Sequence, residues 1–305
     1  MVVSLKRVLV TGGTGFIGTK LIEVLIRNGF GVVLLTRSPE KVKQTGRLRA
    51  YHCDLTDNDI KGVLSQIKNI NYVIYMASDI DWNKSFDKNT LLSLNLNIRN
   101  FLEIIRNFEE QLEKVIYISS YIVYPLSSKQ VWKEILDLNS INLYGAQKNI
   151  AELFLNVINH RTTIKGISLR ISSVYGPGMN NSLTIPRWID QAKSGRSITI
   201  TGDISKEINY IYLDDVVDAI LAALERGESG IYNIASENNV TLLQLSELIK
   251  DIIGGDVSIV LNNQFGSSSE SHRQCKIDIT KSIEKIGFKP KISLRDGISK
   301  LLKGD

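Results

Sequence analysis

The chain has 305 residues, 43% hydrophobic and 23% charged, a balance that argues against intrinsic disorder and allows one large α/β domain or a domain with a smaller lobe. Its net charge is 37 − 32 = +5, spread along the chain with no basic, aromatic-rich stretch, so nucleic acid is not an expected partner. No apolar run approaches the ~20 residues that span a bilayer, and Met1–Gly13 does not resemble a signal peptide. Two cysteines cannot form a disulfide framework. We therefore expect a cytoplasmic protein with no membrane partner.

The first half of the chain alternates short β-branched runs with longer amphipathic stretches. Strands are predicted at Arg7–Val10, Val32–Thr36, Leu48–His52, Tyr72–Tyr75, Val115–Ser119 and Ile167–Ile171. Helices are predicted at Phe16–Arg27, Ile60–Ile67, Thr90–Phe108 and Leu143–Ile158. The strand runs are nearly continuous in apolar residues, as parallel strands covered on both faces require. The alternation predicts an α/β protein with a Rossmann-type doubly wound parallel sheet in residues 1–175.

After residue 175 the predicted elements become shorter. Strands are expected at Ile198–Thr201, Ile208–Leu213 and Ile231–Ile234, and helices at Val216–Glu225 and Leu242–Ile253. Thr241 is a candidate N-cap of the last helix, and Gly254 is its stop signal. The Ser- and Asn-rich segment Asn262–Ser271 is expected to be a mobile loop that orders when substrate binds. Residues 176–305 are therefore predicted to form a smaller substrate-binding lobe, interleaved with the end of the main sheet.

Three spaced glycines join the first predicted strand to the first predicted helix. In Thr11–Gly18, Gly12 permits a tight turn, Gly15 lets a pyrophosphate approach the backbone, and Gly18 lets the helix pack close to the strand. The helix N-terminus offers free amides and the positive end of its dipole to the phosphates. A strand before and a helix after make this pattern more specific than glycines alone, and it predicts a dinucleotide site.

In such a fold, residues at the end of the second strand recognise the adenosine ribose of the cofactor. A carboxylate there selects NAD by binding the 2′-hydroxyl, whereas an arginine accommodates the 2′-phosphate of NADP. The chain has Thr36-Arg37-Ser38, a cation between two hydroxyls and no carboxylate. The guanidinium of Arg37 suits bidentate binding of a phosphate, so NADP is the expected cofactor and NAD remains possible.

Tyr144 and Lys148 lie one helical turn apart and share a helix face. An ammonium beside a phenol favours the phenolate, so the pKa of Tyr144 is expected to fall, and such a phenol can exchange a proton with a carbinol oxygen while a hydride moves. The pattern occurs often by chance. Here it follows a strand that ends in Ser119-Ser120, where a hydroxyl could bind the same oxygen.

With the glycine turn, the serine and Tyr-x-x-x-Lys in this order, the chain resembles the extended short-chain dehydrogenase/reductase family, in particular its NAD-dependent epimerase/dehydratase branch. The resemblance runs over nearly the whole chain. Its further matches are Cys53-Asp54-Leu55, Ala77-Ser78, Asn95, Leu169–Gly178, Ile211–Val216, Asp278–Lys281 and Gly287–Pro290.

The resemblance implies roles by position. The expected cofactor-binding residues are Gly12, Gly15, Phe16, Ile17, Gly18, Arg37, Asp54, Leu55, Ala77, Ser78, Tyr144, Lys148 and Ile171. Among them, Phe16 and Ile17 would present amides to the pyrophosphate, and Asp54 would bind the adenine amino group. The expected catalytic residues are Ser120, Tyr144 as the acid/base, and Lys148, which would also bind the nicotinamide ribose. Ser173 and Arg273 are expected to contact the substrate.

Departures from the family pattern narrow the reaction. Tyr121-Ile122 stand where dehydratases have Asp-Glu, and the Cys and His residues do not fall where epimerase-reductases place an extra acid or base. Ile208-Asn209-Tyr210 stand where many nucleotide-sugar enzymes have Arg-Asp-Phe. The favoured function is therefore an NADP-dependent 4-keto reductase or 4-epimerase of a nucleotide sugar. The alternatives are an NADP-dependent reductase of a non-nucleotide ketone, resembling hydroxysteroid and dihydroflavonol relatives, and a non-catalytic NADP-binding sensor.

Two further expectations concern assembly and metals. Family members often dimerise through a four-helix bundle, which here would use the helices Thr90–Phe108 and Leu143–Ile158. Asp214-Asp215 resembles a metal pair only superficially. With no further ligand at a suitable spacing, the pair is interpreted as a cap at a helix N-terminus and no metal is expected.

Overall fold

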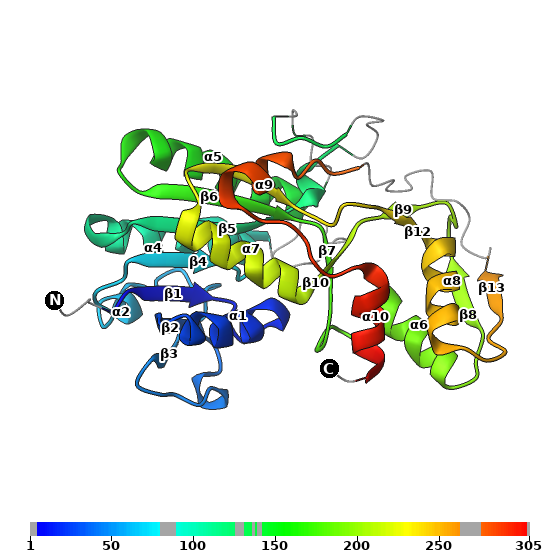
Figure 1. The fold of residues 1–305 in the computed structure, drawn as a ribbon. Helices are drawn as coiled ribbons and strands as arrows, with labels where there is room; N and C mark the ends of the chain where they lie inside the picture. The colour runs from blue at the N-terminus through cyan, green and yellow to red at the C-terminus, as the bar shows by residue number, and fades with distance from the viewer. Residues whose placement is uncertain are drawn as a thin grey trace.

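A parallel sheet of seven strands forms the centre of the protein (Figure 1). The computed structural model describes residues 5–79, 90–125, 131–135, 138, 142–262 and 276–303. The strands of the sheet are β1 (Arg7–Thr11), β2 (Gly31–Thr36), β3 (Leu48–His52), β4 (Tyr72–Tyr75), β5 (Lys114–Ser120), β6 (Lys165–Ile171) and β11 (Gly230–Ile234). Their order is β11-β6-β5-β4-β1-β2-β3, and every neighbouring pair is parallel. The predicted Rossmann-type doubly wound sheet is confirmed.

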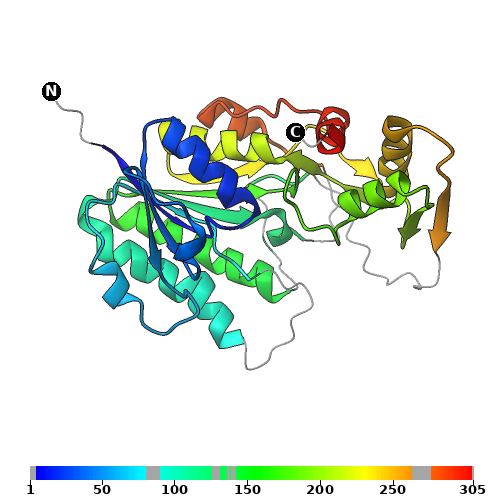
Figure 2. The ribbon, with the colours of Figure 1, turned by 90° about the horizontal axis from the view of Figure 1, so that it is seen from below.

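Helices cover both faces of this sheet, as Figure 2 shows. One layer holds α1 (Phe16–Arg27), α7 (Leu213–Arg226) and α9 (Thr280–Ile286); the other holds α2 (Lys61–Leu64), α3 (Thr90–Leu94), α4 (Asn100–Phe108) and α5 (Leu143–Arg161). Along β1, Val8 and Val10 pack into the core under α1 and α7, while Leu9 packs into the opposite core with α4 and α5. This two-sided burial is why the strands are apolar at every position.

A second, smaller core lies beyond the carboxyl ends of the strands. It is built from α6 (Thr184–Lys193), β8 (Ile198–Thr201), α8 (Leu242–Ile253), β13 (Ile259–Asn262) and α10 (Leu294–Lys303). Two short strand pairs join it to the main sheet: β7 (Ser173–Tyr175) with β10 (Tyr210–Tyr212), and β9 (Glu207–Ile208) with β12 (Val240–Thr241). Two elements that come after residue 175 are part of the first unit: β11 is a strand of the main sheet, and α7 packs against that sheet. The division of the chain into residues 1–175 and 176–305 stays a prediction.

Several predicted boundaries differ from the structure. The helix predicted at Ile60–Ile67 is reduced to α2, and the strand predicted at Ile208–Leu213 is split at Asn209, whose side chain donates to the Ser236 carbonyl at 3.0 Å. The helix predicted at Thr90–Phe108 is helical throughout but contains a π-helical segment, η2 (Asn95–Arg99). The helices α6, α9 and α10 and the strands β7, β12 and β13 were not expected.

The capping prediction for Thr241 is confirmed, whereas that for Asp214-Asp215 is wrong. Thr241 accepts a hydrogen bond from the Gln244 amide at 3.1 Å and completes a capping box. The N-cap of α7 is Tyr212, with no side-chain cap. Asp215 instead accepts hydrogen bonds from the amides of Lys291 and Ile292, at 2.9 and 3.1 Å, and so fastens the C-terminal segment to α7.

Two expectations fall partly or wholly outside these residues. The predicted loop Asn262–Ser271 lies outside the described residues after Asn262, and Arg273 also lies outside them. Within the part of the chain that the structure describes, no helix is long and apolar enough to cross a membrane.

The packing of α10 gives a stability prediction. A Cβ at Gly297 would overlap the Tyr175 hydroxyl and lie 2.8 Å from a ring carbon of Tyr212. Gly297→Ala should therefore lower the free energy of unfolding by about 1–3 kcal/mol, because the second core must move apart. Gly62→Ala is the matched control, since no atom lies within 4 Å of its Cβ and alanine favours a helix. Denaturant unfolding of both variants checks this; equal stabilities would contradict it.

Candidate active site

The turn after β1 is closed around glycines. Gly12 has φ 68°, which side chains rarely adopt, and a Cβ there would lie 2.9 Å from the Ala77 amide nitrogen. Thr11 ties this turn to the end of β4, because its hydroxyl accepts a hydrogen bond from the Ala77 amide at 3.1 Å. A Cβ at Gly18 would lie 2.5 Å from Gly13 Cα, so α1 packs against the turn as closely as its backbone allows.

The N-terminus of α1 has no side-chain cap. The N-cap residue is Gly15, which has no side chain to accept hydrogen bonds from the first amides of the helix, and the first turn has no acidic residue. The amides of Phe16 and Ile17 and the positive end of the helix dipole are therefore suited to an anion. The structure brings together the glycines and amides that the sequence predicted for a pyrophosphate.

Asp54, Leu55 and Arg37 lie at the carboxyl ends of β2 and β3, as expected for the adenosine end of such a site. Asp54 accepts hydrogen bonds from the amide and hydroxyl of Thr56, at 2.9 and 2.8 Å. Burial acts to raise the pKa of Asp54, but the Thr56 hydrogen bonds and the nearby Arg37 charge outweigh it, so the pKa is lowered. Leu55 is buried, and Arg37 is exposed to solvent. An ionised carboxylate and a free cation therefore lie close together here.

Ser120 and Tyr144 meet at the end of β5. Ser120 is the last residue of β5, and its hydroxyl accepts a hydrogen bond from the Ile122 amide at 3.3 Å. Tyr144 lies in the first turn of α5, which Asn142 caps by accepting from the Gly145 amide at 2.8 Å. The phenol of Tyr144 is hydrogen bonded to Ser120.

Ser78 and Ile171 complete this edge. Ser78 follows β4 and is also hydrogen bonded to the Tyr144 phenol. Ile171 ends β6 directly opposite Ser120 in the register of the two strands. Residues that follow or end β4 and β5 thus contact one phenol, and the end of β6 lies beside the end of β5.

Lys148 is buried beneath Tyr144. Its ammonium nitrogen donates to the Ile118 carbonyl at 2.7 Å and lies 4.6 and 5.4 Å from the ring centres of Tyr117 and Tyr144. Burial lowers the pKa of Lys148 to about 7, against the opposing effect of the Glu152 carboxylate. The ammonium is therefore easily lost at neutral pH in the protein alone.

The pKa of Tyr144 is raised rather than lowered. Burial of the phenol raises it to about 12, and the hydrogen bonds from Ser120 and Ser78 only partly offset this effect. The sequence argument assumed a charged Lys148 one turn away. In the structure the phenol and the ammonium are both buried, and desolvation favours the neutral form of each. The expected lowering is wrong for the protein alone.

A buried ion pair lies one turn beyond Lys148. Arg170 on β6 contacts Glu152 through two nitrogens, at 2.6 Å from Nη2 to Oε2 and 3.1 Å from Nε to Oε1. Ser168 donates to the same carboxylate at 3.0 Å. The carboxylate and guanidinium side chains are only 3% and 1% exposed. A carboxylate is thus fixed on the helix that carries both Tyr144 and Lys148.

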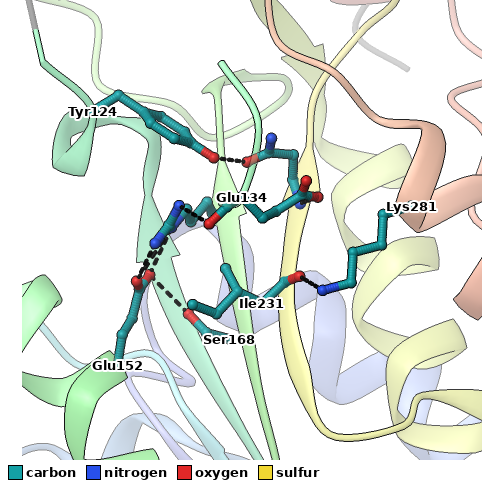
Figure 3. A network of polar contacts seen from close by, with 8 residues as sticks. Tyr124, Glu134, Glu152, Ser168, Ile231 and Lys281 are labelled. Carbon is teal, nitrogen blue, oxygen red and sulfur yellow. Dashed lines mark hydrogen bonds and ion pairs between the residues drawn. The ribbon is translucent and has the colours of Figure 1, made fainter. Parts of the chain in front are cut away.

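The ion pair continues into a wider network, which Figure 3 shows. Arg170 Nη1 donates to the Glu134 carbonyl at 3.4 Å, and its guanidinium lies 4.9 Å from the Tyr124 ring centre. The Tyr124 hydroxyl donates to Asn233 Oδ1 at 2.6 Å. The sequence argument gave no role to Glu152 or Arg170. The spacing Tyr-x-x-x-Lys-x-x-x-Glu could have found Glu152, because it places Tyr144, Lys148 and Glu152 on one helix face.

A pocket of about 180 Å³ opens beside this edge of the sheet. Tyr121, which follows Ser120, lines it together with Ser173, which the sequence predicted to contact substrate. Lys206 brings a positive charge to the lining, and burial lowers the pKa of that ammonium. The rest of the lining is Val174, Met179, Leu183, Thr184, Ile185, Ile208 and Tyr210. The pocket therefore joins a largely apolar wall to one cation.

A larger pocket of about 390 Å³ lies between the glycine turn and α10. Thr14, Gly15 and Phe16 are among its lining residues, but Ser120, Tyr144 and Lys148 are not. Among the described residues, no group of three or more His, Cys, Asp or Glu side chains is placed to hold a metal ion.

Comparisons with known proteins connect this geometry to an enzyme family. The family model described as "NAD dependent epimerase/dehydratase family" matches residues 8–235. The chain is 29% identical to dTDP-4-dehydro-6-deoxyglucose reductase of Escherichia coli over 312 residues, which cover 97% of this chain and 96% of that protein. It is 28% identical to a putative UDP-glucose 4-epimerase of Methanocaldococcus jannaschii, over 97% of each chain.

Solved structures agree with these relatives. UDP-glucose 4-epimerase of Thermotoga maritima with UDP-glucose is 27% identical, superposes with a TM-score of 0.86 and covers 98% of both chains. UDP-glucuronic acid 4-epimerase of Bacillus cereus with UDP-glucuronic acid and NAD is 25% identical, with a TM-score of 0.82 over 96% of both chains.

The buried Glu152–Arg170 ion pair should contribute measurably to stability. Glu152→Gln leaves the Arg170 guanidinium without a counter-charge in a dry site, so the free energy of unfolding should fall by about 3–5 kcal/mol. Asp190→Asn is the control: it breaks an exposed pair with Arg196, which should cost less than about 1 kcal/mol. Urea unfolding at pH 7 measures both. A Glu152→Gln variant as stable as Asp190→Asn would show that the pair adds little.

Proposed function

The chain belongs to the NAD dependent epimerase/dehydratase family, and from this premise we propose that it moves a hydride between NADP and a keto or hydroxyl carbon of a nucleotide sugar. It is an NAD(P)-dependent enzyme of the epimerase and reductase type. The observation that carries the proposal is the meeting of Ser120, Tyr144 and Ser78 at the strand ends, with Lys148 directly beneath them.

The residues at the glycine turn fit a nicotinamide dinucleotide. Gly12 and Gly18 let the turn pack closely against the end of β4 and the start of α1, and the uncapped end of α1 favours the charge of a pyrophosphate. Asp54 and Leu55 would bind the adenine, Ala77 and Ser78 would line the ribose path, and Lys148 would bind the nicotinamide ribose. Ile171 would meet the carboxamide through its backbone.

The proposed chemistry divides two tasks between two hydroxyls. The bound nicotinamide would supply or accept the hydride. Tyr144 would give its phenol proton to the substrate oxygen during reduction and take it back during oxidation. Ser120 would hold that oxygen by a hydrogen bond, and the ammonium of Lys148 would stabilise the phenolate. Burial excludes water from all three groups and strengthens these interactions.

We propose NADP rather than NAD as the preferred cofactor. Arg37 directly follows β2, where such folds bind the adenosine ribose. Its side chain is exposed, so its charge is available to a 2′-phosphate. No carboxylate stands in Thr36-Arg37-Ser38 to bind a 2′-hydroxyl. An epimerase recycles its own hydride, whereas a reductase consumes reduced cofactor, so this preference favours reduction.

A nucleotide sugar is the proposed substrate. The relatives named above act on dTDP- and UDP-sugars, and the pocket beside Ser120 contains Ser173 and the cation Lys206, which suit a sugar hydroxyl and a phosphate. Arg273, outside the described residues, is proposed to reach the diphosphate. Tyr121-Ile122 in place of two carboxylates argues against 4,6-dehydration.

A specific observation favours a second candidate. Val174, Met179, Leu183, Ile185 and Ile208 make much of the pocket wall apolar, which suits a ketone without a nucleotide. A thermal-shift and activity screen of UDP- and dTDP-4-keto sugars against hydrophobic ketones, with NADPH present, separates the two. Stabilisation and turnover by the ketones alone would replace the nucleotide-sugar proposal.

We also propose a homodimer formed through α5 and α3. Ile150, Leu153, Phe154 and Val157 are exposed by 37%, 67%, 39% and 54%, and their spacing places them on one stripe of α5. Leu91, on α3, is 70% exposed. A second copy would cover these side chains in a four-helix bundle.

The buried free thiol of Cys53 suits a reducing compartment, so the cytoplasm is the proposed location.

Substitution of the acid/base tests the proposed chemistry. Tyr144→Phe should keep cofactor affinity and lower turnover by about 10²–10⁴-fold, because the ring remains but its proton is gone. Ser120→Ala should cost less, and Lys148→Met should also weaken cofactor binding. Steady-state kinetics and cofactor titration measure these effects. Unchanged turnover in Tyr144→Phe would remove the acid/base role from Tyr144, whereas absence of turnover in the unsubstituted protein would favour the non-catalytic sensor.

Cofactor choice is tested at Arg37. Arg37→Ala should weaken NADP binding by about 1.5–3 kcal/mol, because a charged partner of the 2′-phosphate is lost, and leave NAD binding nearly unchanged. Lys41→Ala, a nearby exposed cation, is the control and should change neither affinity. Calorimetric titration of both cofactors decides; equal affinities in the unsubstituted protein would contradict the preference.

The dimer is tested on α5. Leu153→Glu would bury a charge in the proposed interface, so sedimentation should show a monomer at micromolar concentration. Ile283→Glu places the same charge at another exposed apolar position, on α9, and should leave the dimer intact. A monomeric unsubstituted protein would end this proposal.

A further inference from the structure

The loop that follows β3 contains Asp54 and Leu55, the two residues proposed to bind adenine. We call residues 54–58 the β3 loop. It contains no helix or strand, and the backbone hydrogen bond within it runs from the Asp57 amide to the Asp54 carbonyl at 3.1 Å. A loop with so little regular structure depends on its surroundings for a fixed shape.

Side-chain amides from η2 and α4 hold this loop. Asn100, the first residue of α4, donates from Nδ2 to the carbonyls of Leu55 and Asp57, both at 2.8 Å. Asn95, on η2, donates from Nδ2 to the Thr56 carbonyl at 3.1 Å. Three successive carbonyls of the β3 loop therefore accept hydrogen bonds from two asparagines.

The partners of Asn100 fix the orientation of its amide. Backbone carbonyls can only accept hydrogen bonds, so the nitrogen of the amide must face Leu55 and Asp57. The side chain is only 1% exposed, and solvent therefore does not compete for these two bonds. Loss of Asn100 would leave two loop carbonyls without this donor.

A second set of hydrogen bonds connects the held carbonyls to the Asp54 carboxylate. Thr56 lies between Leu55 and Asp57, and it donates to Asp54 Oδ1 from its amide at 2.9 Å and from its hydroxyl at 2.8 Å. Within the part of the chain that the structure describes, no group donates to Asp54 Oδ2. This oxygen can accept an N–H of the adenine amino group.

Apolar packing fastens the same loop to α4. The Leu55 side chain is 6% exposed and lies in the core that also contains Phe101 and Ile104 of α4. The carbonyl of Leu55 is bound by Asn100 and its side chain by the core, so the loop is attached to one helix in two ways. A loop that is already ordered loses less conformational entropy when a ligand binds.

We propose that Asn100 is a positioning residue for the cofactor, which fixes the β3 loop on α4 so that Asp54 Oδ2 meets the amino group of adenine. The inference rests on the proposed adenosine site. Asn100 is too buried to contact the cofactor itself, so it acts through Thr56 and Asp54.

Two charged groups also act on the Asp54 carboxylate. Arg37 follows β2, His52 ends β3, and both interact with Asp54 through their charges. Asn100 carries no charge, and its substitution leaves both of these groups in place. A change in adenine recognition on substitution of Asn100 therefore reports the geometry of the loop.

The first test measures recognition of the adenine amino group by calorimetric titration. The probes are NADPH and deamino-NADPH, in which an oxygen replaces that amino group. The unsubstituted protein should bind NADPH about tenfold more tightly, the effect of one hydrogen bond to a charged group. Asp54→Ala should remove this difference. Asn100→Ala should weaken NADPH binding and bring the two affinities close together, because Asp54 is no longer held in place.

A matched control separates positioning from a general loss of stability. Asn159, on α5, also makes two hydrogen bonds to the backbone: it donates to the Gly166 carbonyl at 3.0 Å and accepts from the Gly166 amide at 2.6 Å. Gly166 lies at the amino end of β6, whereas the proposed cofactor site lies at the carboxyl ends of the strands. Asn159→Ala and Asn100→Ala should both lower the melting temperature, but only Asn100→Ala should change the ratio of the two affinities.

A second variant excludes an effect of the cavity that alanine leaves. Asn100→Leu keeps a side chain of similar size but has no donor, so it should lose the preference for NADPH in the same way. An unchanged ratio in either folded Asn100 variant, or an equal change in Asn159→Ala, would overturn the inference. An unsubstituted protein that binds both probes equally would also overturn it. NADPH binding without turnover of any nucleotide sugar would contradict the proposed function and leave this inference standing.

Discussion

The parallel alignment of β1, β4, β5 and β6 is the constraint on which the site depends. Parallel strands end at the same edge of a sheet, so whatever follows each strand is brought together there. The glycine turn follows β1, Ser78 follows β4, and Ser120 ends β5 opposite Ile171 at the end of β6. The helix α5 packs against β5 and β6 and adds Tyr144 and Lys148 to the same edge.

Burial at this edge sets the electrostatics of the proposed acid/base. In the protein alone, burial shifts both the phenol of Tyr144 and the ammonium of Lys148 toward their neutral forms, raising the pKa of Tyr144 and lowering that of Lys148 to about 7. The Glu152–Arg170 pair fixes a carboxylate one turn from Lys148 without leaving it uncompensated. Charge at the site is thus controlled by packed neighbours rather than by solvent.

The second core determines what the site can accept. The strands β7 and β9, which join it to the main sheet, carry Ser173 and Ile208 to the pocket wall, with Lys206 just before β9. Asp215 holds the C-terminal segment against α7 by two backbone hydrogen bonds.

The sequence alone predicted the first six strands, β1 to β6, the turn Thr11–Gly18, and the edge shared by Ser120, Tyr144 and Lys148, because each depends on local spacing or strand order. Only the tertiary structure decided the rest. Asp215 binds distant amides rather than capping its own helix, and Asn97 meets Gln147 because a π-helical turn faces α5. Local spacing predicted a lowered pKa for Tyr144, and burial reversed it. Spacing along the chain records which side chains are near in sequence, but desolvation and hydrogen-bond partners depend on everything packed around them.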